Sequence, residues 1–256
     1  MAMALEHKEF KNPPIKEAIF AISFKETIPQ DKLILFAESN YVKENFPIFQ
    51  QGVRVEVSNK PTKDPKQLIS TTEKHEGFLV RSGTGKERNA IINVNPTMLS
   101  YHNSNKYAGW DNMYAELRTI WKEFCTSSGK SVVSQISVRY LNHISLPFPF
   151  PSKGGFSDYI KLMPQIPEGI NNSVDSFFIQ INIANDEGDL KGIITETILP
   201  TNDINILNLL LDLSVVKQND FDCEKEEMWD TFVKIRGYKN KIFLSCITEE
   251  TEKLFN

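Results

Sequence analysis

The chain is interrupted near its centre by PFPFPSKGG at residues 147–155, where three prolines alternate with phenylalanines and two glycines follow. Proline has no backbone N–H and a fixed φ, so this segment can neither continue a sheet ladder nor enter the interior of a helix. We therefore predict an extended connector at 147–155, which separates an N-terminal half at 1–146 from a C-terminal half at 156–256. With 256 residues in all, the chain is long enough for each half to bury a core.

Hydrophobic periodicity predicts strands and helices in both halves. Residues that alternate between apolar and polar predict strands at 15–26, 52–59, 77–82, 89–95, 132–146, 176–184, 192–199 and 204–216. Apolar residues three or four apart predict helices at 31–46, 110–128, 156–163 and 224–247, with a short final helix at 248–255 that Thr248 caps. In the long helix at 224–247, Lys239 occupies one of the positions in the three- to four-residue spacing of the apolar residues. The predicted fold class is α+β, with two similar halves, each a mostly antiparallel sheet covered by helices on one side.

Charge and cysteine content limit the classes of partner. The formal net charge is -4 and the isoelectric point about 5.7, so no overall positive field attracts nucleic acid or anionic lipid. The clearest basic patch is formed by Lys60, Lys63, Lys66 and Lys74; we favour a solvated loop there and keep nucleic-acid binding as an alternative. Three cysteines far apart in sequence and an N-terminus without a secretory signal favour a cytoplasmic protein with no membrane partner.

The strand before the connector carries the best candidate contacts. Alternation places Arg139 and His143 on one face of this strand, separated by about 13 Å at ~3.3 Å per residue, and turns Asn142 toward the core. The two side chains are too far apart for a direct pair, but both can line one groove. A buried Asn needs hydrogen-bond partners, so we expect Asn142 to brace the backbone where the two halves meet.

A carboxylate pair is the alternative candidate site. Asp212 lies within LLLDLSVV, where both faces are rich in Leu and Val, and Glu196 lies on the preceding predicted strand. Such a pair suits acid–base chemistry in a hydrolase or a nucleic-acid-processing enzyme. We favour the interpretation that both carboxylates lie on the exposed face of an antiparallel hairpin. The four histidines show no metal-ligand spacing, so we expect neither a metal nor a cofactor.

Four stretches together, NPPIKEAIFAISF, VRYLNHISLP, LLLDLSVV and KNKIFLSCITEE, give the chain a family resemblance. It resembles a sporadically distributed bacterial family of about this length, whose members begin with an Asn-Pro-Pro strand and carry a central Arg-Tyr-x-Asn strand. Where those members often have a basic residue after the Asn, this chain has His143. The resemblance implies no activity and no catalytic residue; the patchy distribution implies an accessory factor of a mobile or phage-defence locus.

No catalytic constellation emerges from these patterns, so the sequence favours a non-catalytic binding or interaction protein. The expected partner is a protein or a small ligand, held at the junction of the two halves, with Arg139, Asn142 and His143 as contacts. The hydrolase that uses Glu196 and Asp212 and the nucleic-acid binder that uses the loop from Lys60 to Lys74 remain the alternatives. Homo-oligomerisation stays open.

Overall fold

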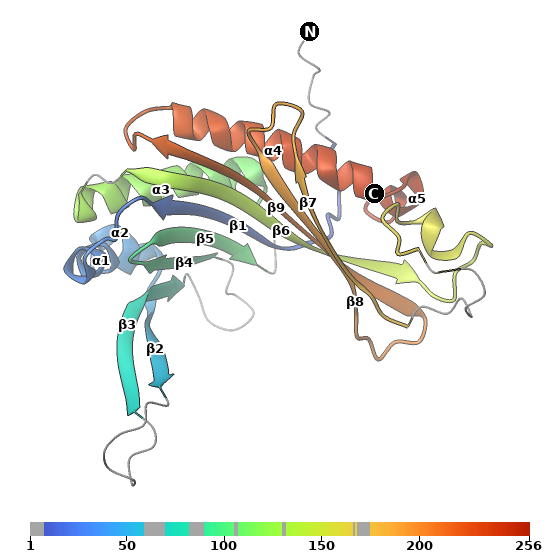
Figure 1. The fold of residues 1–256 in the computed structure, drawn as a ribbon, viewed down its shortest axis with the longest axis horizontal. Helices are drawn as coiled ribbons and strands as arrows, with labels where there is room; N and C mark the ends of the chain where they lie inside the picture. Colours follow the sequence, from blue (N-terminus) through green and yellow to red (C-terminus); the bar gives the residue numbers. More distant parts are fainter. Residues whose placement is uncertain are drawn as a thin grey trace.

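A computed structural model describes residues 8–58, 70–81, 90–104, 107–129, 132–165, 167 and 175–256, with the side chains of 52–58 and 70–76 left out. Within these ranges the backbone forms one antiparallel sheet with the strand order β2-β3-β4-β5-β1-β6-β9-β8-β7 (Figure 1). The strands are β1 (Ile15–Phe24), β2 (Ile48–Ser58), β3 (Ser70–Arg81), β4 (Ala90–Asn95), β5 (Met98–Ser104), β6 (Val133–Pro147), β7 (Phe178–Ala184), β8 (Lys191–Leu199) and β9 (Ile206–Phe221).

The prediction of two sheets, one in each half, is wrong. Strand β6, on the N-terminal side of the connector, pairs with β1 along one edge and with β9 along the other, from Val133 opposite Phe221 to Pro147 opposite Ile206. The two halves therefore share a single continuous sheet. The alternation within β6 shows which residues face the core, but not which strands pair with its two hydrogen-bonding edges, because backbone pairing is the same for any side chain.

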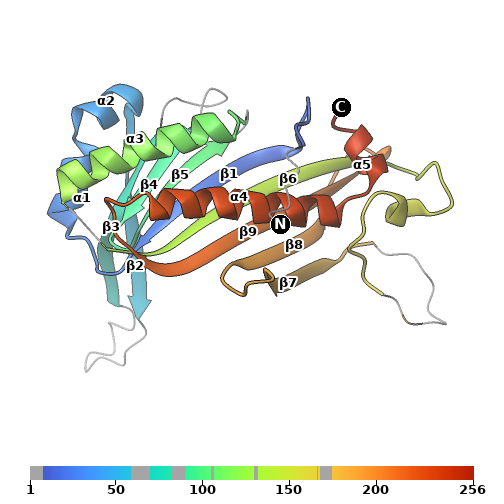
Figure 2. The same cartoon turned by 90° about the horizontal axis from the view of Figure 1, so that it is seen from above.

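Helices cover one face of the sheet. The helices are α1 (Gln30–Ala37), α2 (Asn40–Asn45), α3 (Trp110–Ser128), α4 (Glu227–Cys246) and α5 (Glu249–Lys253), with a 3-10 turn at Gly155–Asp158. Figure 2 shows α3 and α4 side by side above the central strands. Their apolar stripes, predicted from the spacing, face the sheet: Met113 and Leu117 of α3 and Phe232 and Ile235 of α4 are fully buried.

Local differences from the predicted helices have local causes. The single helix predicted at 31–46 is divided into α1 and α2, because the Ser39 side chain accepts a hydrogen bond from the Val42 amide and starts a new helix. The helix predicted at 156–163 is only the short 3-10 turn. The Thr248 cap of α5 is confirmed, with the Thr251 amide 3.4 Å from its hydroxyl.

The main core lies between the sheet and α3 and α4. Phe20 of β1 stacks with Phe232 of α4 at a centroid distance of 6.0 Å, and Phe24 stacks with Phe124 of α3 at 5.1 Å. These contacts join the first strand to helices from both halves, so one core spans the predicted boundary. Among the described residues, no helix has the length and hydropathy needed to cross a membrane.

Candidate ligand pocket between α3 and α4

The offset between α3 and α4 creates a pocket on the helix-covered side of the sheet. The two helices run antiparallel: the Arg118 guanidinium of α3 pairs with Glu226 just before α4, and the Arg236 guanidinium lies 5.1 Å from the centroid of the Trp110 ring at the start of α3. Helix α4 then continues to Cys246, beyond the point where α3 begins. Beyond the N-terminal end of α3, the space beside α4 forms a pocket of about 460 Å³.

Segments from both halves of the chain line this junction pocket. The N-terminal segment 8–15 and the segment 107–112, which leads into the first turn of α3, contribute one part of the wall, and α4 contributes another. Tyr140 and Asn142 of β6 also line it. The lining therefore comes from both sides of residues 147–155, mainly from helices and the N-terminal segment, and we call this space the junction pocket.

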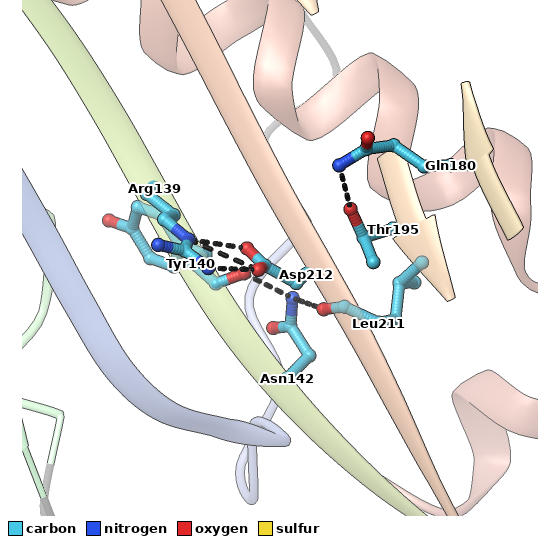
Figure 3. Close-up of polar contacts among 7 residues, drawn as sticks. All are labelled: Arg139, Tyr140, Asn142, Gln180, Thr195, Leu211 and Asp212. Atoms are coloured by element: carbon cyan, nitrogen blue, oxygen red, sulfur yellow. Dashed lines mark hydrogen bonds and ion pairs between the residues drawn. The ribbon is translucent and has the colours of Figure 1, made fainter. Parts of the chain in front are cut away.

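Hydrogen bonds fix the two β6 side chains of the pocket. The hydroxyls of Tyr140 and Tyr107 are 2.7 Å apart, and Asn142 Nδ2 donates to the carbonyl of Leu211 on β9 at 2.9 Å (Figure 3). Burial raises the pKa of both phenols, so both stay protonated at neutral pH. The pocket therefore presents a pair of neutral hydroxyls and an amide that braces two neighbouring strands.

Lys239 is the most unusual group in the pocket. Its Nζ lies 3.9 Å from the centroid of the Tyr140 ring, and the structure gives it no hydrogen bond or ion pair among the described residues. The residue as a whole is partly exposed, but the surroundings of Nζ decide the charge, and these are desolvated. Desolvation, with a smaller effect from the Arg236 charge, lowers the pKa of Lys239 to about 7.

Positive charge predominates around the pocket. Its lining holds four basic side chains, Lys8, Lys11, Arg236 and Lys239, against two acidic ones, Glu9 and Asp111. Lys8 forms an ion pair with Glu252, which lies outside the lining. Asp111 is 93% exposed and pairs with Arg236 at 3.6 Å, so it screens that guanidinium from the solvent side.

The N-terminus of α3 adds backbone donors. Gly109 is the N-cap, with φ 88° and no side chain to accept from the first amides, and an added Cβ there would meet nothing within 4 Å. Uncapped amides at a helix N-terminus attract anions. This end of α3 lies in the same pocket lining as Arg236 and Lys239.

The three predicted contact residues lie on opposite faces of β6. Asn142 lines the pocket, whereas Arg139 and His143 share the other face of the sheet, as the alternation predicts. Arg139 Nε donates to the two Asp212 oxygens at 2.9 and 3.1 Å (Figure 3), and burial lowers the pKa of His143, with a contribution from Lys16. The structure therefore does not bring the three together around one ligand.

Arg139 belongs to a polar row that crosses this second face. His102 Nδ1 of β5 lies 2.9 Å from Glu17 Oε1 of β1, and this hydrogen bond holds the pKa of Glu17 below its usual range, with a weaker effect from Arg139. On the far side of Asp212, Gln180 Nε2 donates to Thr195 Oγ1 at 3.2 Å (Figure 3). Most of these groups already bind one another.

The proposed carboxylate pair is not formed. Asp212 is opposite Thr195 in the β8–β9 register, so Glu196, the next residue along, points to the other face of the sheet. The expectation that both carboxylates are exposed is also wrong, because Glu196 has no exposed surface and Asp212 is held by Arg139. In the described part of the chain neither Glu196 oxygen has a hydrogen-bond partner, and burial raises the pKa of Glu196 to about 8.

The remaining reactive, metal-binding and basic groups offer less. Burial raises the pKa of the Cys246 thiol to about 12, so it stays protonated and is a poor nucleophile. In the described part of the chain, no group of three His, Cys, Asp or Glu side chains could hold a metal ion. Residues 60–66 of the lysine loop lie outside the described residues, as does the side chain of Lys74 on β3.

Sequence reasoning missed Lys239, Gly109 and Tyr107 as site residues. One signal was present: Lys239 occupies a position in the apolar stripe of the last helix, where a lysine has to be explained. Gly109 and Tyr107 carried no comparable signal, because their role depends on where α3 begins relative to α4. No protein-family model matches the sequence, and a search of curated proteins finds no significant match. The function has to be inferred from the chemistry of the pocket.

Proposed function

We propose that the protein is a non-catalytic binding protein that takes a small anionic ligand, with a carboxylate or phosphate group, into the junction pocket. The observation that carries the proposal is Lys239, whose ammonium is desolvated in the pocket without a carboxylate partner among the described residues. A desolvated cation is costly unless an anion accompanies it. A bound anion would supply that partner.

Two further features support an anion. Arg236 lies near Lys239 on α4, and the uncapped start of α3 lines the same pocket. The volume of about 460 Å³ falls in the usual range for small-molecule sites. Aromatic rings of Trp110 and Tyr140 give the rest of the ligand an apolar surface.

The alternatives have weaker support. A hydrolase built on Glu196 and Asp212 needs both carboxylates on one side of the sheet, whereas they lie on opposite faces. The hypothesis of nucleic-acid binding depends on a lysine loop at residues 60–66, which lies outside the described residues.

The proposal is tested by titrating inorganic phosphate, lactate and citrate into the purified protein. Binding is followed by calorimetry and by the intrinsic tryptophan fluorescence, to which Trp110 in the pocket lining contributes. We expect Lys239→Met to weaken binding of the best probe by about tenfold or more, because one charge-assisted contact is lost. Asp111→Asn is expected to strengthen binding several-fold, because it removes a negative charge from the pocket lining.

Lys241→Met is the matched control for this titration. Lys241 lies on the same helix, is 63% exposed, pairs with Asp186 and does not line the junction pocket. Its substitution should leave binding unchanged. The proposal fails if none of the three probes binds at millimolar concentration, or if Lys239→Met and Lys241→Met bind the best probe equally.

A further inference from the structure

We infer that Cys125 of α3 and Cys223 in the turn before α4 form a reversible disulfide in the presence of hydrogen peroxide. The two cysteines are far apart in the sequence, but the fold brings their thiols into contact, with a side-chain hydrogen bond between them. Neither cysteine lines the junction pocket, so this modification site is separate from the proposed function.

Two contacts hold the segment that carries Cys223 against α3, independently of the thiols. Trp121 Nε1 donates to the Cys223 carbonyl at 3.4 Å, and the Arg118 guanidinium donates to the two Glu226 carboxylate oxygens at 2.9 and 2.6 Å. Arg118, Trp121 and Cys125 follow one another at spacings of three and four residues, so they share one side of α3. Cys125 is therefore the next side chain along the side of α3 that already contacts this segment. A disulfide requires two cysteines held close in this way, because a larger separation demands backbone movement.

Both cysteines are within reach of a small oxidant, because each is a free thiol with partly exposed surface. Burial raises the pKa of Cys125 to about 12, and the contact with Cys223 adds to this effect, so Cys125 stays protonated at neutral pH. Cys223 lies in a turn in which its neighbours Asp222 and Glu224 are exposed. We therefore assign the first reaction with peroxide to Cys223 and the closing of the bond to Cys125.

Hydrogen peroxide supplies the oxidising equivalents of the reaction. The Cys223 sulfur attacks one peroxide oxygen, the O–O bond breaks, and the products after proton transfer are a sulfenic acid and one water. The Cys125 sulfur then attacks the sulfenic sulfur and the S–S bond forms. The hydroxide that leaves takes the Cys125 proton and becomes a second water. The two thiols lose two electrons and two protons in all, and one peroxide is reduced to two waters.

Cys246 provides a control within the same chain. It is a free and buried cysteine at the far end of α4, and the 20 residues of this helix place it about 30 Å from the turn that carries Cys223. In the folded chain it therefore cannot reach either of the other two cysteines.

The test is peroxide oxidation of the reduced, intact chain, followed by alkylation and peptide mass spectrometry without reduction. We expect one linked pair of peptides, joined through Cys125 and Cys223 and lighter by two hydrogens than the separate peptides. Dithiothreitol should remove the link, and Cys246 should be recovered as the alkylated thiol. The same treatment in urea should also give links to Cys246, because unfolding removes the fixed arrangement.

Variants separate the two steps of the reaction. Cys125→Ser should prevent the link and leave a sulfenic acid on Cys223, which dimedone captures, whereas Cys246→Ser should form the link as fully as the native chain. Recovery of both Cys125 and Cys223 as free thiols after excess peroxide would overturn the inference. Oxidation of either one without a link, or a link to Cys246 in the folded chain, would also overturn it. Because the native chain itself is mapped, the result does not depend on the folding of a variant.

Discussion

Lys239 and Glu196 are both ionisable and desolvated. Desolvation favours the uncharged form of each side chain, so it moves their pKa values in opposite directions. The pKa of Lys239 falls to about 7, and the pKa of Glu196 rises to about 8. Both lie on the helix-covered side of the sheet, where water is excluded. Only Lys239 borders the junction pocket, so Lys239 can gain a ligand as partner while Glu196 remains a cost to the folded state at high pH.

For Glu196→Gln we expect a change in the pH dependence of stability. The folded pKa of Glu196, about 8, lies above the ordinary value of 4.5, so the folded state binds more protons between these values. Its contribution is therefore fully present below about pH 4.5 and is lost as pH rises through 8. The variant should lack this decline and be more stable than the native chain at pH 8 by on the order of a few kcal/mol. Urea unfolding of both proteins from pH 5 to 9 measures this difference in the free energy of unfolding. The exposed Glu187→Gln serves as control, and parallel profiles for all three proteins would refute the expectation.

The Arg139–Asp212 pair gives a second prediction at this scale. The Asp212 side chain is only 10% exposed, whereas that of Arg139 is half exposed. Arg139→Met should destabilise the fold by about 1–3 kcal/mol, because it leaves a largely buried carboxylate without its donor. Adding Asp212→Asn should recover part of that loss. Chemical denaturation of the two single variants and the double variant measures the coupling, and additive effects would show that the pair is not coupled.

At the level of elements, the ends of α3 offer a matched comparison. Gly109 before the helix and Gly129 after it both have φ 88° with extended ψ, and an added Cβ at either would meet nothing within 4 Å. This backbone region is essentially restricted to glycine. Only Gly109 lines the junction pocket.

We expect Gly109→Ala and Gly129→Ala each to lower stability by about 1–3 kcal/mol through backbone strain alone. Only Gly109→Ala should also weaken anion binding, because it shifts the first amides of α3. Thermal unfolding measures the first effect and calorimetric titration the second. Equal affinities in the two variants would remove the α3 N-terminus from the proposed site.

At the level of the whole molecule, one sheet and one core join the two halves. Strand β6 pairs with both β1 and β9, and Phe20 of β1 stacks on Phe232 of α4. Neither half keeps these contacts alone. The junction pocket likewise exists only when the N-terminal segment, α3 and α4 are assembled.

We therefore predict that fragments 1–155 and 156–256 do not fold separately. Each would expose the unpaired backbone edge of a long strand and a large apolar face. Circular dichroism of each fragment should show no cooperative thermal transition, whereas the mixture should recover a transition close to that of the intact chain. Cooperative melting of either isolated fragment would instead indicate independent domains.

Much of the local structure was predictable because periodicity is a property of each segment. The strand at 132–146 and the helix at 110–128 correspond to β6 and α3, and the faces of Arg139 and Asn142 follow from alternation alone. The division at Ser39 was missed because an N-cap interrupts a helix without breaking its apolar spacing. The local pattern placed Lys239 in the apolar stripe of the last helix, but it did not show which residues surround the side chain.

The sequence by itself determined most of the strands and helices and the faces that Arg139 and Asn142 take, because these depend on neighbours within a few residues. Strand β5 and the 3-10 turn at Gly155–Asp158 were not among the elements it predicted. The tertiary structure alone decided that the halves share one sheet, that Glu196 and Asp212 lie apart, and that α4 extends past the start of α3. Those outcomes depend on backbone pairing and on the offset of helices from distant parts of the chain, which local periodicity does not encode. The pocket around Lys239 is the product of that offset.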